Sequence, residues 1–259
     1  NLYFMQTTRQ NGSLYTNIQN NIATIEFGHP ASNSFPSELL DRLTNELNVI
    51  SKNDLVSIII LKSEGDRAFC AGASFDELVA ITNLEEGKQF FSGFANVINA
   101  MRTCGKIIIG RLQGKTVGGG VGLAAACDYV LATENASIKL SELTIGIGPF
   151  VIEPAVKRKI GLAGLSELTL DATNWKTAYW AKERGLYAKV FENIKELDSE
   201  IERFAQKLAT YNPKALLDMK NVLWENTSHW NELLEERASI SGELVLSEFT
   251  KKALSKFSK

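Results

Sequence analysis

The sequence predicts an α/β core followed by a helical C-terminal region. Two almost wholly apolar segments, 55–61 and 106–112, have the character of strands that are covered on both faces in a parallel sheet. Each is followed by a glycine-containing turn and a helical pattern, and from Glu153 onward nearly every periodic segment is helical. Repeated strand–helix units that precede a run of helices are typical of an α/β domain with a helical extension.

The first elements are expected to be a β-hairpin and a long helix. Residues 14–18 and 22–27 are short β-type runs on either side of Asn20-Asn21, a pair that tolerates positive φ. Apolar residues then recur at helical spacing over 35–52. The other elements of this half are expected as helices at 88–102 and 121–127 and as short strands at 129–132 and 136–140.

Six helical segments are predicted after Glu153, separated by glycine, asparagine or proline residues. They span residues 155–160, 165–170, 177–183, 194–210, 213–224 and 230–249. We divide the chain into a core, 5–190, and a C-terminal helical region, 191–259. Residues 1–4 look like the remnant of a protease-cleavable tag, with Met5 as the native start.

The composition narrows the classes of partner and compartment. The 259 residues are 44% hydrophobic and 22% charged, as in an ordinary globular protein, and no apolar run is long enough to span a membrane. A formal charge of −2 gives no argument for nucleic acid or an anionic membrane as partner. Cys70, Cys104 and Cys127 form no CxxC pair, so neither a disulfide framework nor a metal site is supported. We expect a cytoplasmic protein that needs no metal or redox cofactor.

Three consecutive glycines, Gly118-Gly119-Gly120, mark the most informative turn of the chain. Glycines are costly to order, so an exposed backbone is expected to be needed there. A strand-to-helix turn of this kind can bind a phosphate, or a carbonyl oxygen that becomes anionic during a reaction. The alternative is that the glycines serve only a tight turn and close helix–sheet packing. The spacing fits neither a Rossmann nor a Walker phosphate loop.

A second turn of small residues, Ala71-Gly72-Ala73, follows the first apolar strand. Adjacent parallel strands would bring both turns to the same edge of a sheet, where ligands usually bind. Two backbone N–H groups that converge on one oxygen form an oxyanion hole, in which each donor contributes about 3–4 kcal/mol of barrier reduction.

Three groups of residues, taken together, form a specific pattern. They are Arg67-Ala68-Phe69-Cys70-Ala71-Gly72-Ala73, Gly118-Gly119-Gly120 with Cys127-Asp128, and Leu140-Ser141-Glu142-Leu143 with Gly146 and Pro149. This pattern resembles the enoyl-CoA hydratase/isomerase (crotonase) superfamily over residues 16–257. The resemblance implies a spiral of β–β–α turns with a C-terminal helical region, assembled as a homotrimer or hexamer. It also implies an acyl-CoA thioester substrate whose carbonyl becomes an enolate, held by the N–H groups of Ala73 and Gly119.

Glu142 matches the second catalytic glutamate of that superfamily and is the expected acid/base. The alternative is that Glu142 is a solvated residue at the end of a strand or the cap of a helix. The position of the first glutamate is occupied by Gly122. Hydration across a double bond ordinarily uses two carboxylates, whereas moving a double bond from the 3 to the 2 position needs a single base. Gly122 therefore favours a 3,2-enoyl-CoA isomerase.

The run 144–156 favours a hydratase instead of an isomerase. It lacks the Pro-Gly-x-Gly-Gly common in the superfamily and resembles a bacterial branch generally assigned as methylglutaconyl-CoA or related hydratases, which also tolerate glycine at the first position. We therefore place hydration of a 2-enoyl-CoA first and isomerisation second. A family member that binds acyl-CoA with little turnover is the alternative from another class. Asp76, Glu77 and Glu153 are candidates to replace the missing acid, or are solvated helix residues.

The same resemblance implies a site for the CoA part of the substrate. Phe249 and Lys252 match an aromatic residue and a lysine that touch CoA, often across a subunit boundary; a solvated lysine is the alternative. The segment 75–94 is expected to line the acyl pocket, where Phe90, Phe91 and Phe94 would limit chain length or simply pack in the core. The CoA-binding residues implied are Pro30, Ala31, Ala71, Gly72, Gly118, Phe249 and Lys252.

Overall fold

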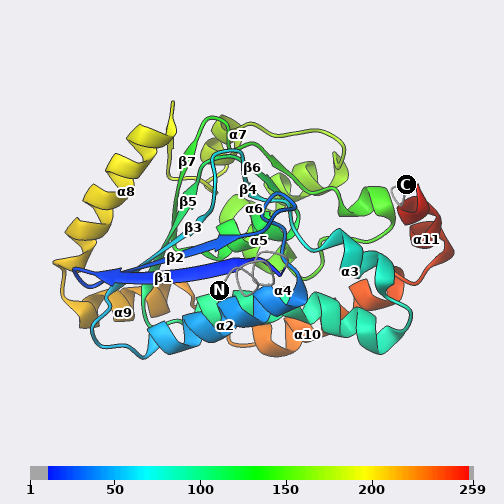
Figure 1. Cartoon of the computed structure of the whole chain (residues 1–259), viewed down its shortest axis with the longest axis horizontal. Helices are drawn as coiled ribbons and strands as arrows, with labels where there is room; N and C mark the ends of the chain where they lie inside the picture. Colours follow the sequence, from blue (N-terminus) through cyan, green and yellow to red (C-terminus); the bar gives the residue numbers. More distant parts are fainter. Residues whose placement is uncertain (1–10, 257–259) are drawn as a thin grey trace, which may run out of the picture.

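Two β-sheets organise the chain in the computed structural model, which describes residues 11–256. The expected tag remnant, 1–4, and Met5 lie outside the described residues. A six-stranded sheet has the order β1-β2-β3-β5-β7-β9, and a three-stranded sheet has the order β4-β6-β8 (Figure 1). The strands are β1 Ser13–Gln19, β2 Ile22–Gly28, β3 Ile58–Ser63, β4 Ala68–Cys70, β5 Ile107–Leu112, β6 Lys115–Val117, β7 Tyr129–Thr133, β8 Ile138–Lys139 and β9 Lys189–Phe191.

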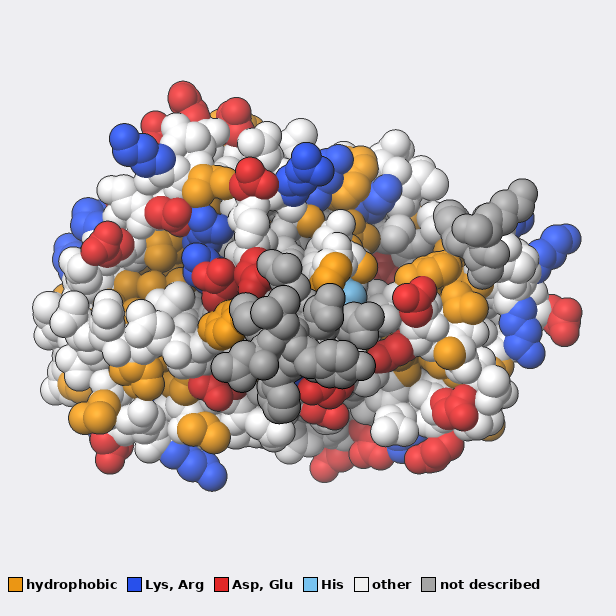
Figure 2. All heavy atoms as spheres, viewed as in Figure 1, with side chains coloured by type: hydrophobic (Ala, Val, Ile, Leu, Met, Phe, Trp, Pro, Cys, Tyr) orange, Lys and Arg blue, Asp and Glu red, His pale blue; other side chains and the backbone are white. Residues whose placement is uncertain are grey.

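Helices surround both sheets and make up most of the C-terminal part. They are α2 Ser37–Ser51, α3 Phe75–Ala80, α4 Leu84–Thr103, α5 Gly119–Ala126, the 3₁₀ helix η1 Glu142–Ile145, α6 Glu153–Leu170, α7 Ala178–Glu183, α8 Ile194–Ala209, α9 Pro213–Leu223, α10 Trp230–Leu244 and α11 Glu248–Ser255. No helix within residues 11–256 is both long and apolar enough to cross a membrane. On the face shown in Figure 2, acidic and basic side chains lie among small apolar groups, in keeping with the nearly balanced charge.

The predicted hairpin is confirmed. Strands β1 and β2 pair antiparallel, and both turn residues, Asn20 and Asn21, have positive φ, at 51° and 62°. Two positive φ angles at the centre of a two-residue loop twist the strands in the direction that a sheet requires. The other neighbours in this sheet pair parallel, as the apolar strands predicted.

Both faces of the large sheet are covered, because its strands present apolar side chains in both directions. In β3, Ile59 and Leu61 belong to the main core with residues of α2 and α4. The alternate residues Ile58 and Ile60 pack against α8 on the other face. Figure 1 shows α8 beside the large sheet at one end of the molecule and α11 at the opposite end.

One expectation about the glycine turns is wrong in its detail. Strand β5 does not run into the three glycines; the chain passes through Gln113 and Gly114 into β6 of the small sheet. A Cβ on Gly114 would lie only 1.5 Å from the carbonyl oxygen of Arg67, so the two chain segments cross in close contact. Strands of three residues are too short to give a periodic signal. Both turns therefore follow strands of the small sheet, β4 and β6, which are parallel neighbours.

The C-terminal helices differ from expectation at two points. The segment predicted as one helix over 230–249 is two, α10 and α11, because the Ser247 side chain caps α11 by accepting a hydrogen bond from the Thr250 N–H. Strand β9 lies within a part of the chain expected to be helical. Helix α10 packs along α4 so closely that a Cβ on Gly242 would lie 2.7 Å from the Lys88 nitrogen.

Candidate active site

The two predicted turns meet in space. Gly72 has a φ of 92°, and a Cβ there would lie 3.2 Å from the Val117 carbonyl oxygen and 3.6 Å from the Gly119 nitrogen. The first turn is fixed by its neighbours, since the Ala71 N–H donates to the Ser32 carbonyl at 3.1 Å. A residue with a side chain at position 72 would have a strained backbone, and its Cβ would crowd the backbone of the second turn. Glycine is therefore needed there.

Two backbone N–H groups are left available where the turns meet. Ala73 and Gly119 are half-buried, and neither N–H donates a hydrogen bond to an acceptor within residues 11–256. Gly119 is the first residue of α5, where helical N–H groups have no partner in the helix and carry its partial positive charge. The pair has the composition of an oxyanion hole.

The triple glycine also serves close packing, as the alternative interpretation of this turn predicted. A Cβ on Gly119 would lie 2.3 Å from the Phe94 ring, and a Cβ on Gly120 would lie 2.7 Å from the Cβ of Cys70. Gly118 has a φ of 54°. Helix α5 can therefore approach β4 and α4 closely, and this approach brings the Gly119 N–H to the first turn.

Glu142 faces the same turn from η1, directly after β8. A Cβ on Gly118 would lie 2.8 Å from Glu142 Oε1. The carboxyl is buried, and its Oε2 has no hydrogen-bond partner within the described residues. Burial raises the pKa of Glu142 from 4.5 to about 7, and a hydrogen bond from its own backbone opposes the shift only in part. The carboxyl can therefore both accept and release a proton near neutral pH.

A cavity of about 190 Å³ opens in front of this carboxyl. Glu142 is its only ionisable side chain among residues 11–256. Phe90, Phe91 and Phe94 line it, as expected for the segment 75–94, while Phe94 also belongs to the main core. The pKa of this carboxyl stays high because the apolar lining does not solvate the ionised form.

Gly122, where a first glutamate was sought, has no space for any side chain. A Cβ there would lie 2.4 Å from Cγ2 and 2.7 Å from Cβ of Ile152, and the Ile152 Cβ moves only with the backbone at the start of α6. Ile152 itself lines the cavity. An isoleucine thus forms the wall at this point.

The three acids considered as replacements lie elsewhere. Glu77 accepts hydrogen bonds from the N–H and the hydroxyl of Ser37, at 2.9 and 2.6 Å. Its carboxylate therefore caps the N-terminus of α2. Glu153 pairs with Arg237 at 3.3 Å, and Asp76 is exposed. None of the three lines the cavity. Glu142 is therefore the one carboxyl in the cavity lining among the described residues.

Asp128 holds the structure together away from the cavity. Its carboxylate accepts hydrogen bonds from the Ile108 N–H and the Trp224 indole, both at 2.7 Å, and pairs with the buried Lys220 at 3.0 Å. These contacts tie β5, β7 and α9 together. Asp128 therefore has a structural role at this junction.

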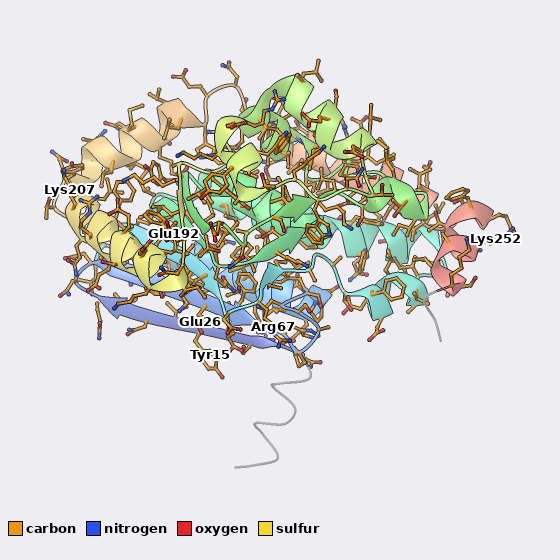
Figure 3. All side chains as sticks on the ribbon, turned by 90° about the horizontal axis from the view of Figure 1, so that it is seen from above. Tyr15, Glu26, Arg67, Glu192, Lys207 and Lys252 are labelled. Atoms are coloured by element: carbon orange, nitrogen blue, oxygen red, sulfur yellow. The ribbon has the colours of Figure 1, made fainter. Side chains whose placement is uncertain are left out.

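Of the residues expected to bind CoA, Ala71, Gly72 and Gly118 line the cavity, and the other four lie in two places outside its lining. Pro30 and Ala31 are exposed on a loop that the Ala71–Ser32 hydrogen bond holds beside the first turn. Phe249 and Lys252 lie on α11, outside the cavity lining. Phe249 is 65% exposed and packs over Gly146, the residue that ends η1. Figure 3 shows Lys252 at the outer extremity of the molecule.

Sequence reasoning gave no role to several further cavity residues, among them Ile152 and Ser241. Ile152 precedes α6, and Ser241 lies in α10, about a hundred residues beyond Glu142 along the chain. Each looks like an ordinary helix or helix-entry residue in the sequence, so no local signal could have selected it.

Comparison with known proteins finds relatives of this chain in sequence and in fold. The Escherichia coli 2,3-dehydroadipyl-CoA hydratase is 28% identical over 216 residues, which cover 81% of each chain. The peroxisomal Delta(3,5)-Delta(2,4)-dienoyl-CoA isomerase of Arabidopsis thaliana is 29% identical over 192 residues, 68% of this chain and 67% of that one. The fold matches the crystal structure of an enoyl-CoA hydratase from Bacillus halodurans, with a TM-score of 0.87 and 21% identity over 94% of this chain and 99% of that chain, so the fold expected from the resemblance is confirmed. The model of the family described as enoyl-CoA hydratase/isomerase matches residues 17–257, and the chain therefore belongs to that family.

Proposed function

We propose that the protein hydrates a 2-enoyl-CoA, with Glu142 as the single acid/base and the N–H groups of Ala73 and Gly119 as the oxyanion hole. The observation that carries the proposal is the position of the buried Glu142 carboxyl, with its pKa near 7, against Gly118. A hydratase among the relatives, which is named for a 2-enoyl-CoA, supports the substrate class.

The reaction can be written with one carboxyl. Ionised Glu142 takes a proton from water while the water oxygen bonds to C3 of the substrate. The electrons of the C2–C3 double bond move toward the thioester, whose oxygen becomes anionic and is stabilised by the Ala73 and Gly119 N–H groups. The Glu142 carboxyl then returns a proton to C2, so that one water has been added and the enzyme is unchanged.

Isomerisation of a 3-enoyl-CoA is the second candidate, and the packing of Ile152 against Gly122 favours it. An apolar wall offers no second group to orient water. In this reaction Glu142 removes a proton from C2, the same oxyanion hole holds the dienolate, and the carboxyl returns the proton at C4.

The deciding experiment follows crotonyl-CoA, 3-methylglutaconyl-CoA and a 3-enoyl-CoA by chromatography and mass spectrometry. The protein, Glu142→Gln and the surface control Glu134→Gln are compared. A gain of one water from a 2-enoyl-CoA, lost only in Glu142→Gln, supports hydration. Migration of the double bond without a change in mass supports isomerisation. Binding without conversion of any thioester would overturn both reactions and leave an acyl-CoA-binding role.

We further propose a homotrimer or a hexamer whose subunits complete each other's CoA sites. Phe249 is largely exposed and Lys252 lies at the outer end of the molecule, away from the cavity of its own chain. A neighbouring subunit could therefore receive both residues, with the ammonium group of Lys252 beside a phosphate. Light scattering at assay concentration tests the assembly, and a monomeric mass would contradict it.

A further inference from the structure

A buried hydroxyl lies in the wall of the cavity without a partner. Ser241, in α10, is 1% exposed, and its Oγ forms no hydrogen bond within residues 11–256. Ser241 lines the same cavity as Glu142. Buried polar side-chain atoms almost always have a hydrogen-bond partner, so a free hydroxyl here calls for a physical reason.

The helix offers Ser241 no substitute partner of the usual kind. A serine in a helix can donate to the carbonyl four residues earlier. Ser239, two residues before it in α10, does so, donating to the Glu235 carbonyl at 3.2 Å. The Ser241 hydroxyl makes no such bond. The Ser241 hydroxyl therefore has no partner in its own helix.

Ser241 and the oxyanion hole lie near different points along α4. The separation can be measured along helix α4, which contacts both places. Phe94 of α4 touches Gly119 of the oxyanion hole. Gly87, seven residues earlier in α4, touches Gly242, the neighbour of Ser241. At 1.5 Å per residue, these two contacts are about 10 Å apart along α4. Phe90 and Phe91 line the cavity between them. A substrate with its thioester between Ala73 and Gly119 would extend its acyl chain toward Ser241.

We propose that the Ser241 hydroxyl donates a hydrogen bond to an oxygen carried by the acyl group of the substrate, several bonds from the thioester. The inference rests on the proposed function, because it takes the thioester to bind at Ala73 and Gly119. A plain alkyl chain would leave the hydroxyl buried and unpaired, which disfavours such a substrate. The preferred thioesters are therefore those with a carbonyl, hydroxyl or carboxylate oxygen on the acyl chain.

The test compares three saturated thioesters of nearly equal shape, which bind but cannot react. In 3,5-dimethylhexanoyl-CoA the chain ends in two methyl groups; in 3-methyl-5-oxohexanoyl-CoA one of them is replaced by a neutral oxygen. In 3-methylglutaryl-CoA both are replaced by carboxylate oxygens. Calorimetry gives the dissociation constants for the full chain, for Ser241→Ala and for Ser239→Ala. The Ser239 variant is the control, because the Ser239 hydroxyl is hydrogen-bonded within its own helix.

We expect at least one oxygen-bearing thioester to bind on the order of tenfold more tightly than the dimethyl one, and this preference to disappear in Ser241→Ala only. The ketone and the carboxylate show which kind of oxygen the site accepts. Equal affinities for all three thioesters, a preference that survives Ser241→Ala, or no binding at all would overturn the inference. The proposed function is tested separately by conversion of the unsaturated thioesters, since binding of the saturated ones does not require turnover.

Discussion

The side chain of Ile152 fills the space in front of Gly122, where a Cβ would lie 2.4 Å from Ile152 Cγ2. This contact explains why the cavity has a single carboxyl among its described residues. A glutamate at position 122 would need Ile152 to give way, so the glycine and the isoleucine form one packing unit. The chemistry of the site is consequently that of one buried acid facing an apolar wall.

That packing unit predicts strong coupling between the two positions. Gly122→Ala should lower the free energy of unfolding by about 1–3 kcal/mol, because the added methyl group overpacks the core. Ile152→Ala should cost about 2–5 kcal/mol through the cavity that it leaves. In the double variant the new methyl group enters that cavity, so its loss should be smaller than the sum of the single losses. Urea unfolding of the four proteins measures the coupling, and additive effects would show that the residues do not interact.

The raised pKa of Glu142 predicts a stability that falls with rising pH. The folded protein holds this proton up to about pH 7, whereas the unfolded chain releases it near 4.5. The contribution is therefore fully present below 4.5 and is lost as the pH rises through 7, a change of about 3 kcal/mol at most. Glu142→Gln should remove this component, so its stability relative to wild type should be greater near pH 8 than near pH 5. A pH-independent difference would show that burial does not shift this carboxyl.

The same group predicts the pH dependence of turnover. Both proposed reactions begin with ionised Glu142 accepting a proton, so kcat/KM should rise with pH and level off above about 7. Initial rates in buffers of constant ionic strength measure the profile. An acidic limb near the ordinary pKa of a glutamate would mean that the free site is more polar than its lining indicates.

Gly119→Ala should impair catalysis through the oxyanion hole. The added Cβ would lie 2.3 Å from the Phe94 ring, so the start of α5 must shift and carry the Gly119 N–H with it. Misplacing one oxyanion donor typically lowers kcat by about a hundredfold or more. Gly164→Ala in α6, away from the cavity, is the control. Steady-state kinetics on the thioester that the conversion assay identifies as substrate measures this loss, and a fully active Gly119→Ala would exclude this N–H from the reaction.

The buried ion pair of Lys220 and Asp128 predicts a large effect on stability alone. The Lys220 ammonium lies 3.0 Å from Asp128 and also donates to the carbonyls of Met101 and Lys106. Lys220→Met leaves a buried carboxylate unpaired and should cost about 3–5 kcal/mol.

The matched control is Lys214→Met in the same helix, whose exposed pair with Asp218 should contribute less than about 1 kcal/mol. Thermal unfolding compares the two variants. Equal losses would mean that burial adds nothing to the Lys220 pair.

The sequence alone determined the class of fold and the family. Apolar runs and glycine turns report locally on burial and on backbone freedom, so the hairpin, the parallel sheet and the two turns could be predicted. Glu142 was singled out by the motif around it. The short strands β4 and β6 were not predicted, because a strand of three residues is too short to show a periodic hydrophobic pattern.

Only the tertiary structure decided what surrounds Glu142. Ile152 and Ser241 reach the cavity from segments far apart in the chain, and their role depends on which atoms they meet there. The pKa of the carboxyl, the space beside Gly122 and the unpaired Ser241 hydroxyl are properties of packed neighbours rather than of any one segment. Local sequence records whether a residue is buried, whereas the free energy of a buried polar group is set by the groups that the fold places next to it.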